Sequence, residues 1–197
     1  AGMMYYSPQI WCSDNTDAID RITIQYGTSF GYPVSAVGSH VSAVPNEQTG
    51  RSTPMHTRGV VAMAGNFGYE LDLSRISEED RQEVKRQIAD CRKYWKLTHE
   101  GLYYRLTDPL HNREFAAWEF ASEDRAEALL NVVTLDNHCN NPTQYVRMSG
   151  LDPEGCYEAQ ESGCIYRGSA LMQAGVPLPF LQDEYQAWQV HFIRKQM

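Results

Sequence analysis

The sequence predicts an α/β fold over residues 1–100 and an antiparallel β fold over residues 101–197. Short apolar segments alternate with amphipathic, helix-like segments in the first half, and turn residues separate several short strand-like segments in the second. Of the 197 residues, 42% are hydrophobic, which is enough to build packed cores. Alternating strands and helices are typical of a parallel sheet with flanking helices.

Three strand–helix units account for the first half. The strands are predicted at residues 9–13, 34–44 and 67–71. Each is followed by a helix, and the three helices begin near residues 18, 54 and 77. Three such units cannot close a (β/α)8 barrel, which needs eight.

The third helix shows the clearest pattern. Its apolar residues Val84, Ile88, Cys91 and Trp95 are spaced four, three and four apart, which predicts that they form the buried face. An ion pair between residues 83 and 86 is expected on the solvent face.

Six strands are predicted in the second half, and they form an antiparallel sheet or sandwich. Residues 125–135 also fit a helix, so that strand remains open. The alternation of Trp188, Val190 and Phe192 places these three side chains on one face, which favours a core position over a sugar-binding platform. The strands are expected at residues 102–107, 115–120, 125–134, 145–148, 164–166 and 185–193.

Charge and composition exclude several classes of protein. The chain has 17 Lys and Arg against 25 Asp and Glu, a net charge of −8, which argues against nucleic-acid and anionic-membrane partners. No apolar run approaches the roughly 18 residues of a membrane span, and no signal peptide is recognisable. The five cysteines are interpreted as reduced thiols of a cytoplasmic protein, with a Cys156–Cys164 disulfide as the alternative. Scattered histidines and the lack of a nucleotide motif predict no metal and no cofactor.

Asp14 is the strongest candidate for a catalytic residue. It follows the first predicted strand at its carboxyl end, where barrel enzymes build their active sites. The alternative is that Asp14 only caps the following helix. Asp17 and Arg21 lie four apart and are expected to form a structural ion pair, with Asp20 on the solvent face. His40 is interpreted as a core histidine.

Several segments of the sequence resemble a known enzyme family. Residues 3–21, which contain the S-D-x-x-D-x-x-x-R motif at 13–21, resemble the segment of glycoside hydrolase family 36 α-galactosidases that holds their acid/base aspartate. The similarity continues through residues 24–33, 39–46, 48–51 and 67–73, and more loosely through 102–106 and 150–153. Val37, Glu47 and Asn66 depart from the residues expected of the family, and they leave the motif intact.

The resemblance implies a particular architecture. Residues 1–100 would be the last three βα units of a (β/α)8 catalytic barrel, and residues 101–197 the C-terminal antiparallel β domain. The expected activity is retaining hydrolysis that releases terminal α-linked galactose from melibiose- and raffinose-type oligosaccharides. The full-length enzyme is expected to be a homo-oligomer without a cofactor.

The resemblance also assigns residues. Asp14 would be the general acid/base, and Trp11 would line the substrate site, with core packing as its alternative role. The nucleophile would lie on an earlier barrel strand, so the 197-residue chain by itself is expected to be inactive and to self-associate through unpaired strand edges. Two rivals stay open: a transferase or α-N-acetylgalactosaminidase relative, and a non-catalytic structural or interaction module.

Overall fold

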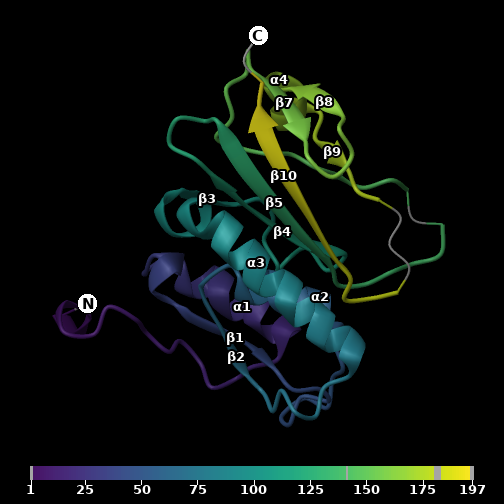
Figure 1. Cartoon of the computed structure of the whole chain (residues 1–197). Helices are drawn as coiled ribbons and strands as arrows, with labels where there is room; N and C mark the ends of the chain where they lie inside the picture. Colours follow the sequence, from purple (N-terminus) through teal and green to yellow (C-terminus); the bar gives the residue numbers. More distant parts are fainter. Residues whose placement is uncertain (1, 141, 180–182, 196–197) are drawn as a thin grey trace. The chain divides into compact units, whose positions relative to one another are not determined.

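A computed structural model describes residues 2–140, 142–179 and 183–195. The chain divides between His99 and Glu100 into two units, each with its own sheet (Figure 1).

The first unit is built around two parallel strands. β1 (Gly38–Ser42) pairs with β2 (Asn66–Glu70), and His40 lies opposite Gly68 in the register. The connection between them contains a helix, as expected for parallel neighbours. The helical elements of this unit are η1 (Gly2–Tyr5), α1 (Ala18–Thr28), η2 (Val34–Ala36), α2 (Met55–Ala62) and α3 (Glu78–Glu100).

One face of this parallel pair is covered by helices. The Ser39 hydroxyl donates to Gln25 Oε1 of α1 at 2.7 Å, and Val41 packs in a cluster with Val84 of α3. Because side chains alternate along a strand, Gly38, His40, Gly68 and Glu70 lie on the opposite face. The parallel strands and their helices agree with the α/β prediction for this half.

The first predicted strand is shorter than expected. Within residues 9–13, only Ile10 makes a strand-type contact, a parallel bridge to Val37. Residues 34–36 of the second predicted strand form the 3-10 helix η2 instead. In the turn that follows, side chains rather than a neighbouring strand accept from the backbone N–H groups of Asn15 and Asp17.

The predicted buried face of α3 is wrong at two positions. Ile88 is 37% and Trp95 49% exposed, whereas Gln87 is buried. The Gln87 amide donates to the carbonyl of Met55 at 2.8 Å and its oxygen accepts from the Tyr69 hydroxyl at 2.8 Å. A fully hydrogen-bonded amide can occupy a core position, and hydrophobic periodicity does not detect it. The expected ion pair between Glu83 and Arg86 is present.

The second unit contains a six-stranded antiparallel sheet with the order β3-β4-β5-β10-β7-β8. β5 confirms the strand interpretation of the ambiguous segment. Three elements were not predicted: β7, β9 and the short helix α4. The bounds are β3 (Leu102–Arg105), β4 (Phe115–Ala121), β5 (Glu127–Thr134), β7 (Cys156–Ala159), β8 (Ile165–Arg167), α4 (Gly168–Gln173), β10 (Ala187–Arg194) and a separate pair, β6 (Tyr145–Val146) with β9 (Val176–Pro177).

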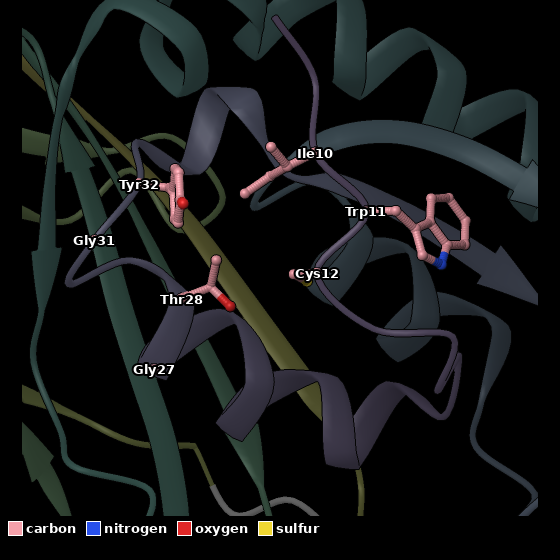
Figure 2. Close-up of a pocket in the computed structure, with 7 residues that line it drawn as sticks. All are labelled: Ile10, Trp11, Cys12, Gly27, Thr28, Gly31 and Tyr32. Atoms are coloured by element: carbon pink, nitrogen blue, oxygen red, sulfur yellow. The ribbon is translucent and has the colours of Figure 1, made fainter. Parts of the chain in front are cut away.

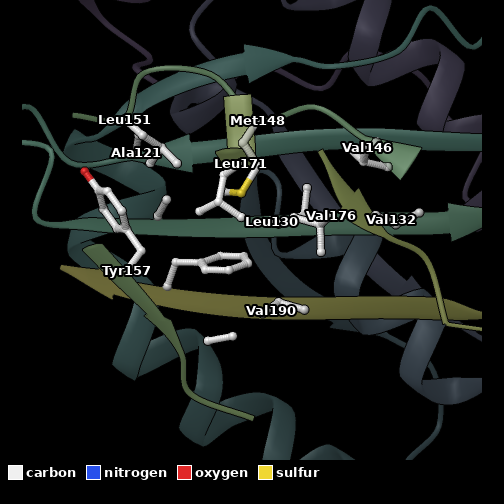
Figure 3. Close-up of a cluster of buried hydrophobic side chains, with 14 of the residues drawn as sticks. Ala121, Leu130, Val132, Val146, Met148, Leu151, Tyr157, Leu171, Val176 and Val190 are labelled. Carbon is white, nitrogen blue, oxygen red and sulfur yellow. The ribbon is translucent and has the colours of Figure 1, made fainter. Parts of the chain in front are cut away.

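A hydrophobic core lies on one face of this sheet (Figure 3). Leu130 of β5 and Val190 of β10 face the same interior as Leu171 of α4. Trp188 packs against this core, which confirms the direction predicted from its alternation with Val190. Trp118 is 6% exposed, so it does not offer a surface platform for a sugar.

None of the described helices is both long and apolar enough to cross a bilayer. All five cysteines are free thiols, so the alternative Cys156–Cys164 disulfide is absent from the structure.

Candidate active site

Asp14 lies where the first strand-like segment ends. The parallel bridge from Ile10 to Val37 aligns this segment with the chain entering β1. Residues 13–17 then turn into α1, and Asp14 is exposed within that turn. Asp14 therefore lies at the carboxyl-terminal edge of parallel strands, where ligand sites of α/β folds are commonly built.

Side chains hold the turn in shape. Ser13 Oγ accepts from the backbone N–H of Asn15 at 3.1 Å, and Asn15 Oδ1 accepts from that of Asp17 at 2.9 Å. Asp17 Oδ1 accepts from the backbone N–H groups of Ile19 and Asp20 at 2.9 and 3.0 Å. Asp17, not Asp14, is thus the N-cap of α1. The carboxylate of Asp14 takes no part in the cap.

Arg21 does not pair with Asp17, so that prediction is wrong. Its guanidinium donates to the carbonyl of Gly38 at 2.7 Å, to the carbonyl of Ser13 at 3.3 Å and to Gln25 Oε1 at 3.2 Å. The Asp17 carboxylate instead accepts from the backbone N–H groups in the first turn of α1 and pairs with another cation. Arg21, 4% exposed, therefore fastens the turn to the start of β1.

The partner of Asp17 is Arg51, which sequence reasoning missed. The Arg51 guanidinium pairs with Asp17 and, at 3.2 Å, with Asp20. Burial works against ionisation of Asp17, but the Thr49 hydroxyl, the backbone N–H of Asp20 and Arg51 together hold the pKa of its carboxyl below the usual value. Arg51 follows β1, and the ends of neighbouring parallel strands meet at one edge, which is the signal that could have found it.

The indole of Trp11 packs against the imidazole of His40 of β1 in a tilted arrangement. Their ring centroids lie 4.6 Å apart with 33° between the planes, and Trp11 is 47% exposed. Gly68 makes room for His40, because a Cβ at position 68 would lie 2.7 Å from the imidazole. Burial lowers the pKa of His40, which Glu70 opposes and Arg21 reinforces. His40 is thus half-buried under an aromatic ring rather than a core residue.

A pocket of about 410 Å³ lies beside the same segment (Figure 2). Ile10, Thr28 and Tyr32 line it, while the indole of Trp11 extends away from it. The lining has no carboxylate, and Asp14 is not part of it. This pocket therefore offers no carboxylate to a bound substrate.

No metal centre accompanies the turn. Across residues 2–140, 142–179 and 183–195, no three or more His, Cys, Asp or Glu side chains are grouped to hold a metal ion.

Comparison with family models gives two matches. Residues 1–101 match the model described as melibiase, and residues 115–192 match the glycosyl hydrolase family 36 C-terminal domain. Together the two models cover both structural units, and the first alone covers more than half of the chain.

Individual relatives agree with the family models. The chain is 57% identical over 192 residues to the bifunctional alpha-galactosidase/sucrose kinase AgaSK of Mediterraneibacter gnavus, covering 98% of this chain and 20% of that protein. It is 49% identical over 184 residues to alpha-galactosidase AgaA of Geobacillus stearothermophilus, covering 93% and 25%. The chain thus spans a quarter or less of these two relatives.

Solved structures match equally well. The galactosidase domain of AgaSK superimposes with a TM-score of 0.96 at 56% identity, over 98% of this chain and 27% of that one. A variant of AgaA in complex with raffinose gives a TM-score of 0.95 at 45% identity, over 98% and 27%. The chain therefore belongs to the melibiase family, the alpha-galactosidases of glycoside hydrolase family 36.

Proposed function

We propose that this chain is part of a retaining α-galactosidase that releases terminal α-linked galactose from raffinose- and melibiose-type oligosaccharides. The observation that carries the proposal is the turn of residues 13–17, which caps α1 with Asp17 and leaves the Asp14 carboxylate exposed. Structures of AgaA variants with raffinose and with stachyose support this substrate class.

In this proposal Asp14 is the general acid/base. It donates a proton to the leaving glycosidic oxygen in the first step and removes one from water in the second. Such enzymes need a second carboxylate, the nucleophile, about 5–5.5 Å away. Asp17 and Asp20 are unsuited because both are committed to Arg51. The resemblance to family 36 α-galactosidases implies a nucleophile on an earlier barrel strand, so we place it in chain outside these 197 residues and expect the 197-residue chain alone to be inactive.

We also propose how the two units fit into the architecture of the full-length enzyme. Residues 1–100 form the last three βα units of a (β/α)8 barrel, and residues 101–197 its C-terminal β domain. The parallel bridge of Ile10, the parallel β1–β2 pair and the helices on one face of that pair support this assignment. Trp11, exposed and three residues before Asp14, is proposed to line the substrate site.

Replacement of Asp14 tests the proposal. In the full-length enzyme, Asp14→Asn should lower kcat/KM for raffinose by about 10²–10⁴-fold, because the sugar leaving group then departs without a proton. The kcat/KM for 2,4-dinitrophenyl α-galactoside should fall much less, since that phenolate leaves without a proton. Added azide should restore turnover of the aryl substrate and yield α-galactosyl azide.

Glu79→Gln, an exposed acid on α3, is the matched control and should keep both activities. Equal loss on both substrates, or no response to azide, would contradict the acid/base role of Asp14. A wild-type enzyme that cleaves neither substrate would contradict the α-galactosidase itself.

We further propose a cytoplasmic location and a homo-oligomeric full-length enzyme. The five free thiols support a reducing compartment. The exposed apolar side chains Ile88 and Trp95 of α3 support burial against another surface. Light scattering coupled to size exclusion measures the oligomer, and cell fractionation measures the location.

A further inference from the structure

The loop that follows β1 is a closed structure. The backbone N–H of Asn46 donates to the carbonyl of Arg51 at 2.9 Å, and that of Gly50 donates to the carbonyl of Asn46 at 2.8 Å. Asn46 Oδ1 accepts from the backbone N–H groups of Gln48 and Thr49 at 3.0 and 3.1 Å. Gly50 has a φ of 70°, which glycine adopts without strain. We call residues 46–51 the clamp loop.

The clamp loop holds the turn that carries Asp14. Gln48 Nε2 lies 3.4 Å from the carbonyl oxygen of Asp14, and Thr49 Oγ1 donates to Asp17 Oδ2 at 2.7 Å. Asn46 Nδ2 donates to Thr16 Oγ1 at 3.2 Å, a third link across a separation of about thirty residues. A single contact of this kind would be weak, but together they fix the loop against the turn.

Arg51 supplies the charged part of this contact. The side chain of Asp17 is 1% exposed, that of Asp20 38% and that of Arg51 27%. A buried carboxylate without a cation is strongly unfavourable, so Arg51 keeps the Asp17 cap in place. By also reaching Asp20, it fixes the first turn of α1 at two points.

We propose that Arg51 is a positioning residue for proton transfer by Asp14, which rests on the proposed function. Arg51 acts through its ion pairs with Asp17 and Asp20. Proton transfer needs the donor within hydrogen-bond reach of the leaving oxygen, and a displacement near 1 Å is costly. Loss of Arg51 therefore slows the proton-transfer step, while it affects the stability of the fold less.

Two substrates separate these effects in the full-length enzyme. Arg51→Gln should lower kcat/KM for raffinose by about 10²-fold and that for 2,4-dinitrophenyl α-galactoside by less than about tenfold. Arg51→Lys, which keeps the charge but loses the planar fork, should recover about tenfold of the raffinose loss. If Arg51 had only a structural role, its replacement would lower kcat/KM for both substrates by the same factor.

Arg75→Gln is the matched control, because Arg75 is 85% exposed and pairs only at the surface with Asp72. It should leave both activities unchanged. If Arg51→Gln does not fold, Arg51→Lys and Asp20→Asn decide, and each must lose more activity on raffinose than on the aryl substrate. Equal losses, or none, would overturn the role of Arg51 while the wild-type activity and Asp14→Asn still support the proposed function.

Discussion

Glu119 on β4 shows how a single residue can depart from its ordinary chemistry. Its side chain is fully buried, Oε2 accepts from the backbone N–H of Ser149 at 2.8 Å, and Oε1 has no hydrogen-bond partner among the described residues. Burial raises the pKa of this carboxyl to about 8, against which the Ser149 bond works. Glu119 is therefore protonated at neutral pH.

This pKa predicts a stability that falls with rising pH. Because the folded pKa lies above the unfolded value of 4.5, the folded state holds the extra proton between pH 4.5 and about 8. The contribution of this proton to the free energy of unfolding is fully present below pH 4.5. It is lost as the pH rises through that window, at up to about 1.4 kcal/mol per pH unit. Glu119→Gln keeps an acceptor for Ser149 and should remove this loss.

Thermal melts of the full-length enzyme between pH 5 and 8.5 measure the effect. The midpoint advantage of Glu119→Gln over wild type should grow steadily across this range. Glu123→Gln, an exposed acid in the turn between β4 and β5, should follow wild type throughout. A constant difference for Glu119→Gln would show that the Glu119 carboxyl is ionised in the folded protein across this range, so that its pKa is not raised.

At the scale of elements, α2 and α3 meet through a glycine and an amide. A Cβ on Gly59 of α2 would lie 2.4 Å from the side chain of Gln87, which is held at both ends by hydrogen bonds. The close approach of the two helices therefore requires glycine at position 59, although glycine weakens a helix.

Gly59→Ala should consequently destabilise the protein by about 1–3 kcal/mol, because the added methyl overlaps Gln87. In a Gln87→Ala background the overlap disappears, and the same substitution should stabilise by up to about 1 kcal/mol through helix propensity. Melts of the four proteins measure this change of sign. The same sign in both backgrounds would show that Gln87 is not what excludes a side chain there.

At the scale of the whole molecule, the two units differ in the size and strand direction of their sheets. In the part of the chain that the structure describes, the first unit has only two parallel strands, and the second has a six-stranded antiparallel sheet with a core. Parallel sheets are normally buried on both faces and longer than two strands. We therefore expect the first unit to depend on further strands.

The 197-residue chain expressed alone should therefore self-associate. Light scattering coupled to size exclusion should give species heavier than 22.4 kDa that grow with protein concentration. The full-length enzyme should instead show one discrete oligomer. A concentration-independent 22.4 kDa monomer that unfolds cooperatively would contradict this dependence on further strands.

Local patterns predicted most elements of this fold. Turn residues and alternation located β3, β4, β5 and β10, and capping residues located the starts of α1 and α3. They failed for β7 and β9, which are two to four residues long and carry no strong alternation of their own. Such short strands form because a neighbouring strand offers hydrogen bonds.

The sequence by itself determined the family, the α/β-then-β order and the importance of the S-D-x-x-D-x-x-x-R motif, because these depend on neighbours along the chain. Only the tertiary structure decided which residue each member of the motif contacts. In the structure, Asp17 caps α1 and pairs with Arg51, and Arg21 donates to the carbonyl of Gly38. Those partners come from different strand ends that meet at one edge, and a contact across thirty-four residues leaves no spacing to read.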